Sequence, residues 1–173
     1  MRKESKEQMA SLISNFHFPT YHEIPNVGLY LEQVTKYINE YLAPFDNLTI
    51  TPSMISNYVK KGLLANPIKK QYYREQIAYI FFIAAAKSVL SLDNLLLFKE
   101  RQKDTYPVDI AYDYFRLEFE NVLQYVFGLK DSLDIVGSDQ NTDEKTMLHN
   151  TIITVAHKIH LDMCFEALRN EKE

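Results

Sequence analysis

The residues best suited to metal chemistry lie near the C-terminal end of the sequence. His157, His160 and Cys164 are spaced i, i+3 and i+7, so they share one face of a helix. Imidazole nitrogens and a thiolate are common ligands of zinc and related metals. Apolar residues share this face, however, and the sequence contains no second cysteine. We therefore interpret the three as partly buried structural residues and predict neither a metal site nor a cofactor.

Residues for enzymatic catalysis are equally sparse. The sequence contains no Ser/His/Asp arrangement, no Gly-rich phosphate loop and no HExxH pattern. Glu118 and Glu120 are two neighbouring carboxylates, but residues two apart on a helix project from different sides. We therefore predict that the protein is not an enzyme.

A different chemistry is indicated by residues 51–64, which predict one short helix with both ends specified. Thr51 suits the N-cap, Pro52 the first helical position and Gly62 the left-handed position after the C-terminus. Lys60 and Lys61 lie in the last turn, where cations interact favourably with the helix dipole.

This predicted helix has an apolar back and a polar front. Ile55 and Val59 are four residues apart and face one way. The polar front consists of Ser53, Ser56, Asn57 and Lys60. An Asn can bond an adenine edge twice, and Ser and Lys can reach bases or phosphates, so this face suits a DNA groove. An ordinary solvated surface helix would show the same pattern.

Three short motifs follow this helix. Gly62-Leu63-Leu64 is followed by Pro67, Lys70-Gln71-Tyr72 comes next, and residues 91–96 read Ser-Leu-Asp-Asn-Leu-Leu. In this order they resemble the DNA-binding domain of the MerR-type winged-helix regulators, in which a Gly-Leu-Leu-x-Pro phrase, a basic wing with Arg-x-Tyr and a last helix follow each other. The chain is also similar to an uncharacterised bacterial family catalogued as a domain of unknown function. The resemblance covers roughly residues 30–98.

The resemblance implies a mostly helical protein in which a winged helix-turn-helix is followed by a helical dimerisation or sensing half. It also implies a transcriptional regulator that binds double-stranded DNA through its second helix and wing. The residues assigned to DNA are Ser53, Ser56, Asn57, Tyr58, Lys60, Lys61, Lys69, Lys70, Tyr72 and Arg74. In the regulators an Arg precedes the equivalent x-Tyr pair, whereas this chain has Ser56 there, so one phosphate contact is missing.

Charge is distributed unevenly along the chain, whose net charge is −4. Residues 47–74 contain five basic residues and no acidic one, whereas residues 89–173 contain 16 acidic and 9 basic residues. The positive charge therefore coincides with the predicted recognition helix and wing, where phosphates would bind.

Composition indicates a folded, soluble protein, with 46% hydrophobic and 24% charged residues. The polar N-terminus is not that of a signal peptide, and the longest apolar run, residues 77–86, is too short to span a bilayer. A lone cysteine suits a reducing compartment. We expect a cytoplasmic protein without membrane contact.

Hydrophobic spacing predicts the helices that must position these residues. We expect helices over residues 3–16, 29–42, 75–89 and 92–99, with Leu48 and Ile50 directed inward between the second helix and the recognition helix. A polar stretch at 101–107 is the best domain boundary. The predicted units are residues 1–24 (helix and linker), 25–104 (winged helix-turn-helix) and 105–173 (helical region).

Two further helices are expected in the C-terminal region, over residues 109–129 and 143–168, with a polar loop at 131–142. The first carries an apolar repeat at Ile110, Tyr114, Leu117, Val122, Tyr125 and Leu129, and the second one at Leu148, Ile152, Val155, Ile159 and Met163. Two such helices rarely bury both faces, so packing on residues 1–24, on a twin subunit, or on both is expected. In regulators of the type this chain resembles, the corresponding half dimerises or binds an effector, so the resemblance implies a homodimer through these helices and an unknown small-molecule effector.

Two alternatives to DNA binding remain open. The first is a helical protein–protein interaction module that kept the fold without binding DNA, which Ser56 and the acidic total charge favour. The second is a small-ligand sensor with an aromatic-lined pocket in the C-terminal half.

Overall fold

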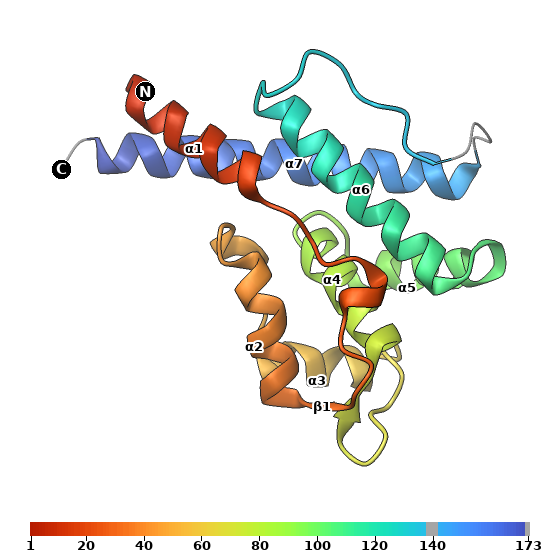
Figure 1. Ribbon diagram of the computed structural model, residues 1–173. Coiled ribbons are helices and arrows are strands. Elements are labelled where there is room, and N and C mark those ends of the chain that lie inside the picture. The colour runs from red at the N-terminus through yellow and green to blue at the C-terminus, as the bar shows by residue number, and fades with distance from the viewer. Residues whose placement is uncertain (138–141, 172–173) are drawn as a thin grey trace.

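The fold is predominantly helical, as predicted, in a computed structural model that describes residues 1–137 and 142–171 (Figure 1). Short 3-10 helices (η) and a two-stranded sheet accompany the α-helices. The elements in chain order are α1 (Lys3–Asn15), η1 (Tyr21–Glu23), β1 (Leu29–Tyr30), α2 (Leu31–Leu42), η2 (Asp46–Leu48), α3 (Pro52–Lys60), β2 (Gln71–Tyr72), α4 (Arg74–Ala86), α5 (Leu92–Thr105), α6 (Val108–Val126) and α7 (Asp143–Asn170).

Helix α1 confirms the predicted N-terminal helix and packs near the C-terminal end of α7. Met9 and Ile13 are buried, and the Arg2 amide donates a hydrogen bond to Glu171 Oε1 (2.6 Å). Figure 1 shows α1, α6 and α7 on one side of the molecule and α2, α3 and β1 on the other, with α4 between them. Residues 1 and 2 therefore lie beside residue 171.

The connector between α1 and β1 (residues 16–24) runs through the core and contacts both sides of the molecule. Phe18 is 1% exposed, and its ring packs against those of Phe81, Phe115 and Phe119 at centroid distances of 5.4, 5.6 and 5.2 Å. The Phe18 amide donates to Glu120 Oε1 (3.0 Å). The predicted linker is thus a structural element, because its backbone donors are satisfied by side chains of α6.

The predicted helix over residues 29–42 begins two residues late, at Leu31. Leu29 and Tyr30 instead form β1, which pairs antiparallel with β2 in the register Leu29↔Tyr72 and Tyr30↔Gln71. Tyr30 then serves as the N-cap of α2, and its amide donates to Gln33 Oε1 (2.8 Å). The periodicity of the sequence did not predict β1, because its strand partner β2 lies about 40 residues further along the chain.

The segment between α2 and α3 is held from within α2. Asn39 Nδ2 donates to the Ile50 carbonyl (2.8 Å), and Asn39 Oδ1 accepts from the Ile50 amide (2.9 Å). Leu48 and Ile50 are buried, as predicted. These contacts fix where α3 begins relative to α2.

Helices α4 and α5 differ from the predicted lengths. Helix α4 ends at Ala86, three residues before the expected end, and α5 continues to Thr105 instead of stopping at residue 99. Most of the stretch expected to be a domain boundary, 101–107, is therefore helical. Buried residues from every helix from α1 to α7 belong to one hydrophobic cluster, which includes residues on both sides of this stretch.

The buried face of α6 has only Val122 in common with the predicted apolar repeat. Tyr112, Phe115, Phe119, Val122 and Leu123 are buried, whereas the predicted Ile110 and Leu117 are 56% and 44% exposed. Helix α6 carries apolar residues on two sides, and the side that packs against α4 and α7 is the more aromatic one. The predicted stripe of α7 is buried from Leu148 to Ile159, with Met163 partly buried.

The expected loop at 131–142 includes residues 138–141, which lie outside the described residues. Within the described part of the chain, no helix combines the length and apolar character needed to cross a membrane.

Candidate nucleic-acid interface

Helix α3 forms as its end signals predict. Thr51 Oγ1 accepts a hydrogen bond from the Met54 amide (3.2 Å), and Pro52 occupies the first helical position. Gly62 adopts φ = 77°, and the Leu63 amide returns to the Tyr58 carbonyl (2.9 Å). Both ends of α3 are thus fixed by local contacts.

The outward face of α3 carries the polar residues assigned to DNA. All of these are exposed: Ser53, Ser56, Asn57, Lys60 and Lys61. The Ser56 hydroxyl donates to the Pro52 carbonyl (3.0 Å), a bond within the helix that a ligand could replace. The helix therefore presents a row of small polar and basic groups to its surroundings.

Tyr58 does not belong to this outward face. Its side chain is 4% exposed and shares the core with Ile55, and burial raises the pKa of its hydroxyl. Val59, which was expected to back the helix, is only partly buried. The apolar side of α3 is therefore formed by Ile55 and Tyr58, and Tyr58 anchors the helix instead of facing a ligand.

The segment after α3 folds into a tight hairpin at residues 68–71. Ile68 and Gln71 exchange two backbone hydrogen bonds (3.0 and 2.9 Å), and Lys69 and Lys70 form the turn between them with φ = 49° and 66°. Positive φ at both central residues defines a type I′ turn, which normally uses Asn and Gly. Each lysine here costs about 1 kcal/mol or more of backbone strain.

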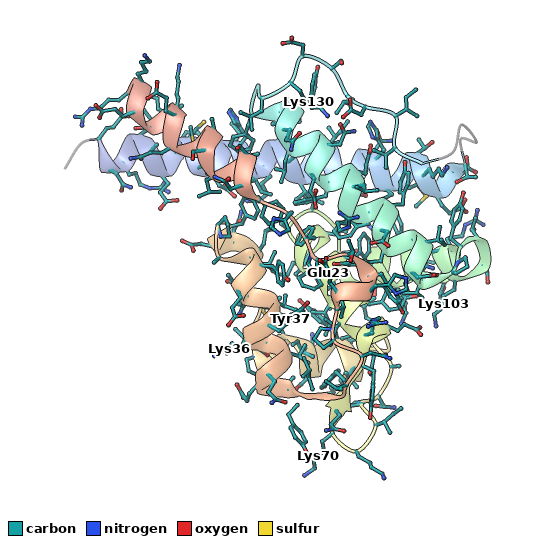
Figure 2. All side chains as sticks on the ribbon, in the orientation of Figure 1. Glu23, Lys36, Tyr37, Lys70, Lys103 and Lys130 are labelled. Carbon is teal, nitrogen blue, oxygen red and sulfur yellow. The ribbon has the colours of Figure 1, made fainter. Side chains whose placement is uncertain are left out.

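The lysines of the hairpin tip are directed away from the protein. Lys69, Lys70 and the neighbouring Ile68 are exposed, Ile68 by 62%. In Figure 2 Lys70 lies at the extreme end of the molecule, on the opposite side from α1 and α7. The strained turn thus holds two ammonium groups at the most protruding point of this region.

Two further residues assigned to DNA have structural contacts instead. Tyr72 is 4% exposed and lies in β2, paired with Leu29. Arg74 donates from Nε to the Ile24 carbonyl (2.8 Å) and from Nη2 to the His22 carbonyl (3.1 Å). Arg74 therefore ties the start of α4 to the connector. We therefore leave Tyr72 and Arg74 out of the surface proposed to contact DNA.

The lysines of α3 and the hairpin keep their charge uncompensated by the protein. Among the ion pairs formed within residues 1–137 and 142–171, none includes Lys60, Lys61, Lys69 or Lys70. We call the exposed set Ser53, Ser56, Asn57, Lys60, Lys61, Lys69 and Lys70 the basic face. Such a surface attracts anions.

Lys99 has a structural role that was not predicted from the sequence. It is 9% exposed, its Nζ donates to the Leu63 carbonyl (2.6 Å), and the same atom lies 4.9 Å from the centre of the Tyr79 ring. Burial lowers the pKa of this ammonium. Lys99 therefore connects α5 to the turn that ends α3. Only its position at the end of an apolar run could have indicated this role.

The histidine and cysteine residues of α7 do not form a metal site in the described part of the chain. His157 is exposed, whereas His160 packs edge-on against Phe127 (4.9 Å between ring centres). Cys164 Sγ lies 3.8 Å from His160 Nε2. His160 and Cys164 are thus brought together without His157.

Glu118 and Glu120 contact different partners, as their spacing predicts. Glu118 is buried and paired with His149 of α7, whereas Glu120 accepts from the Phe18 amide and lies 3.7 Å from Arg116. Burial raises the pKa of the Glu120 carboxyl, although the Phe18 amide and Arg116 oppose this shift. The two carboxylates therefore do not share a site.

Comparison with known proteins gives a family but no characterised relative. No curated protein and no solved structure matches the chain. One family matches residues 19–115, which is more than half of the sequence and contains β1, α2, α3, the hairpin, α4 and α5. The chain therefore belongs to the family described as domain of unknown function (DUF1836).

Proposed function

We propose that this protein is a transcriptional regulator that binds double-stranded DNA through the basic face. The order β1, α2, α3, hairpin, α4 and α5 supports a MerR-like winged helix-turn-helix, with the hairpin as the wing. One observation carries the proposal. An exposed Ser/Asn/Lys helix face and a strained, lysine-tipped hairpin follow each other in the chain, and neither uses its charges within the protein.

Helix α3 is the proposed reading element in the major groove. It is 9 residues long and is held from behind by the buried Ile55 and Tyr58. Asn57 has the donor and acceptor pair that recognises an adenine edge, and Ser53 and Ser56 are short enough to let the helix approach closely. Lys60 and Lys61 extend the contact to the phosphates.

The hairpin is the proposed phosphate clamp. Backbone strain persists where surrounding structure enforces it and is concentrated at functional sites. Here β1 pairs with β2 on one side of the hairpin, and the turn holds Lys69 and Lys70 in the left-handed region. A turn that presents two cations at a protruding tip is suited to the backbone of a duplex.

The proposal includes a homodimer formed through α7. Leu161, Phe165 and Leu168 are 54%, 56% and 39% exposed and are spaced i, i+4 and i+7, so they form one uncovered apolar stripe. A second copy is the occupant that matches twofold DNA sites. Sedimentation should give a dimer for the wild type and a monomer for Leu161→Glu/Phe165→Glu, and a monomeric wild type would contradict this part.

The decisive experiment is fluorescence-anisotropy binding to random and genomic duplex DNA over a salt series. The expected wild-type affinity falls by about 0.9 log unit per log unit of salt for each neutralised phosphate. Lys60→Glu/Lys70→Glu should bind far more weakly, with a salt slope lower by about two.

The matched control is Lys6→Glu/Lys103→Glu, which makes the same change in net charge at exposed lysines of α1 and α5. It should bind like the wild type. If the wild type fails to bind at low salt, or if both double variants lose affinity equally, the DNA proposal is wrong. The protein–protein interaction module would then be the better candidate.

A further inference from the structure

A cavity of about 350 Å³ lies between the end of α5, α6 and the start of α7. Its walls are mainly apolar and aromatic, with Phe98, Tyr106, Ile110, Tyr114, Leu117 and Leu148 among them. This volume falls within the range of sites that hold small organic molecules, roughly 300–1,000 Å³. The cavity lies outside the basic face and is built from other helices.

The cavity accounts for the second apolar side of α6. Ile110, Tyr114 and Leu117 are spaced i, i+4 and i+7, and all three line the cavity, where Tyr114 also packs against the core. Ile110 and Leu117 remain 56% and 44% exposed although α6 already buries an aromatic face elsewhere. Exposed apolar side chains gathered in a hollow mark a binding site more often than scattered ones.

The charged groups around the cavity are compensated by protein partners. Glu144 pairs with Arg101 (2.8 Å), and Asp113 accepts from Arg116 (3.3 Å) and from the Tyr21 amide (2.9 Å). Lys145 Nζ lies 5.4 Å from the centre of the Tyr114 ring. A charged ligand would therefore lose its hydration without gaining an unpaired counter-charge, which disfavours it.

A second hollow has part of its lining in common with this cavity. This smaller hollow of about 60 Å³ shares Phe98, Ala111 and Leu148 with the cavity and is closed by Phe82 and Phe115. The volume of the cavity suits a small molecule.

We propose that this cavity binds a neutral, predominantly apolar small molecule, with Ile110, Tyr114 and Leu117 of α6 as its principal wall. The proposal does not depend on DNA binding. Phe115 and Phe119 of α6 then pack in the core, and Ile110, Tyr114 and Leu117 on another side of the helix contact the ligand.

The test uses the neutral fluorophore N-phenyl-1-naphthylamine with the full chain. We expect saturable, one-to-one fluorescence enhancement by the wild type. Leu117→Glu and Ile110→Glu each place a charge in the wall at an exposed position, so the fold should survive, which circular dichroism checks. Each should weaken binding about tenfold or more.

Two leucine-to-glutamate variants outside the cavity serve as controls. Leu97 of α5 is 59% exposed, and Leu161 belongs to the exposed stripe of α7. Both variants should bind the fluorophore like the wild type. Absence of saturable binding by the wild type, or a loss in Leu161→Glu instead of Leu117→Glu, would overturn the proposal.

Discussion

The basic face and the α6–α7 half of the molecule use charge in opposite ways. Every ion pair within residues 1–137 and 142–171 lies outside residues 8–100. On α6 and α7, by contrast, Glu118 is paired with His149, Arg116 with Asp113 and Glu120, and Lys158 with Asp162. The charged groups of α6 and α7 thus have partners within the protein, and the Glu118–His149 pair joins the two helices, whereas the lysines of the basic face remain available to a partner.

The network around Glu118 is the clearest example of charged side chains that are paired within the protein. Its carboxylate, 4% exposed, pairs with His149 and accepts from Asn121 Nδ2 (3.4 Å). Asn121 Oδ1 accepts from Lys130 Nζ (2.7 Å) and from the Asp134 amide (3.0 Å). This network attaches the loop after α6 to both helices, whereas nothing comparable surrounds Lys60 or Lys70.

The largest expected effect is therefore on stability and comes from the paired region. Glu118→Ala should lower the free energy of unfolding by about 2–3 kcal/mol, because His149 and Asn121 lose a buried charged partner. Ser56→Ala on the basic face should change it by less than about 0.5 kcal/mol. Urea unfolding measures both, and equal losses would show that the two regions do not differ in this way.

A smaller effect of opposite sign is expected at the hairpin tip. Lys70→Gly relieves the left-handed backbone and should raise the free energy of unfolding by about 0.5–1 kcal/mol. The control Lys60→Gly removes the same charge from a helix and should lower it by about 1 kcal/mol.

Both glycine variants should nevertheless bind DNA more weakly, each with a salt slope reduced by about one. Chemical unfolding and anisotropy together check the pair. If Lys70→Gly were less stable than the wild type, the left-handed backbone conformation at residue 70 would not destabilise the folded protein.

The smallest expected effect is a pH dependence confined to the paired region. Burial raises the pKa of Glu120, so the folded protein keeps this proton at a pH where the unfolded chain has released it. The resulting stabilisation is present below about pH 4.5 and is lost as the pH rises through the folded pKa. Relative to Glu120→Gln, the wild type should thus lose stability on going from about pH 4.5 toward neutrality.

The basic face offers a contrast in the same experiment. Residues 47–74 contain no acidic residue and no histidine, the side chains that ordinarily titrate near pH 5 to 7. DNA affinity in this range should therefore be alike for the wild type and Glu120→Gln. A difference in affinity that follows the titration of Glu120 would show that the two regions are coupled.

Local signals explain which parts of this fold were predictable. The ends of α3 follow from Thr51, Pro52 and Gly62, which act through contacts within a few residues. The buried stripe of α7 follows from spacing alone. Strand β1 was missed because Leu29 becomes a strand only through its distant partner Tyr72.

The helix α6 was predicted, but most of its predicted apolar repeat is not buried, for a different physical reason. A helix with apolar residues on two sides gives two acceptable periodic stripes, and only the surrounding helices determine which one is buried. The stripe that spacing favoured, through Ile110 and Leu117, lines a cavity instead of the core.

The exposed residues of the candidate site were predictable where the side-chain type itself favours the surface. Ser53, Ser56, Asn57 and the four lysines are exposed as expected. Tyr58, Tyr72 and Arg74 are amphipathic, so their sequence positions fit either a surface or a structural role. Backbone carbonyls that accept from Arg74, at His22 and Ile24, cannot be found from a sequence pattern.

The connector at residues 16–24 has a consequence for how the chain is made. Its partners come late in the sequence: Arg74 bonds Ile24 across 50 residues, Tyr112 bonds Pro19 across 93, and Glu120 bonds Phe18 across 102. At a synthesis rate of roughly 5–20 residues per second, Phe18 waits about 5–20 s before α6 exists. During that interval this aromatic segment, which packs at the centre of the finished core, has not yet met its partners on α6.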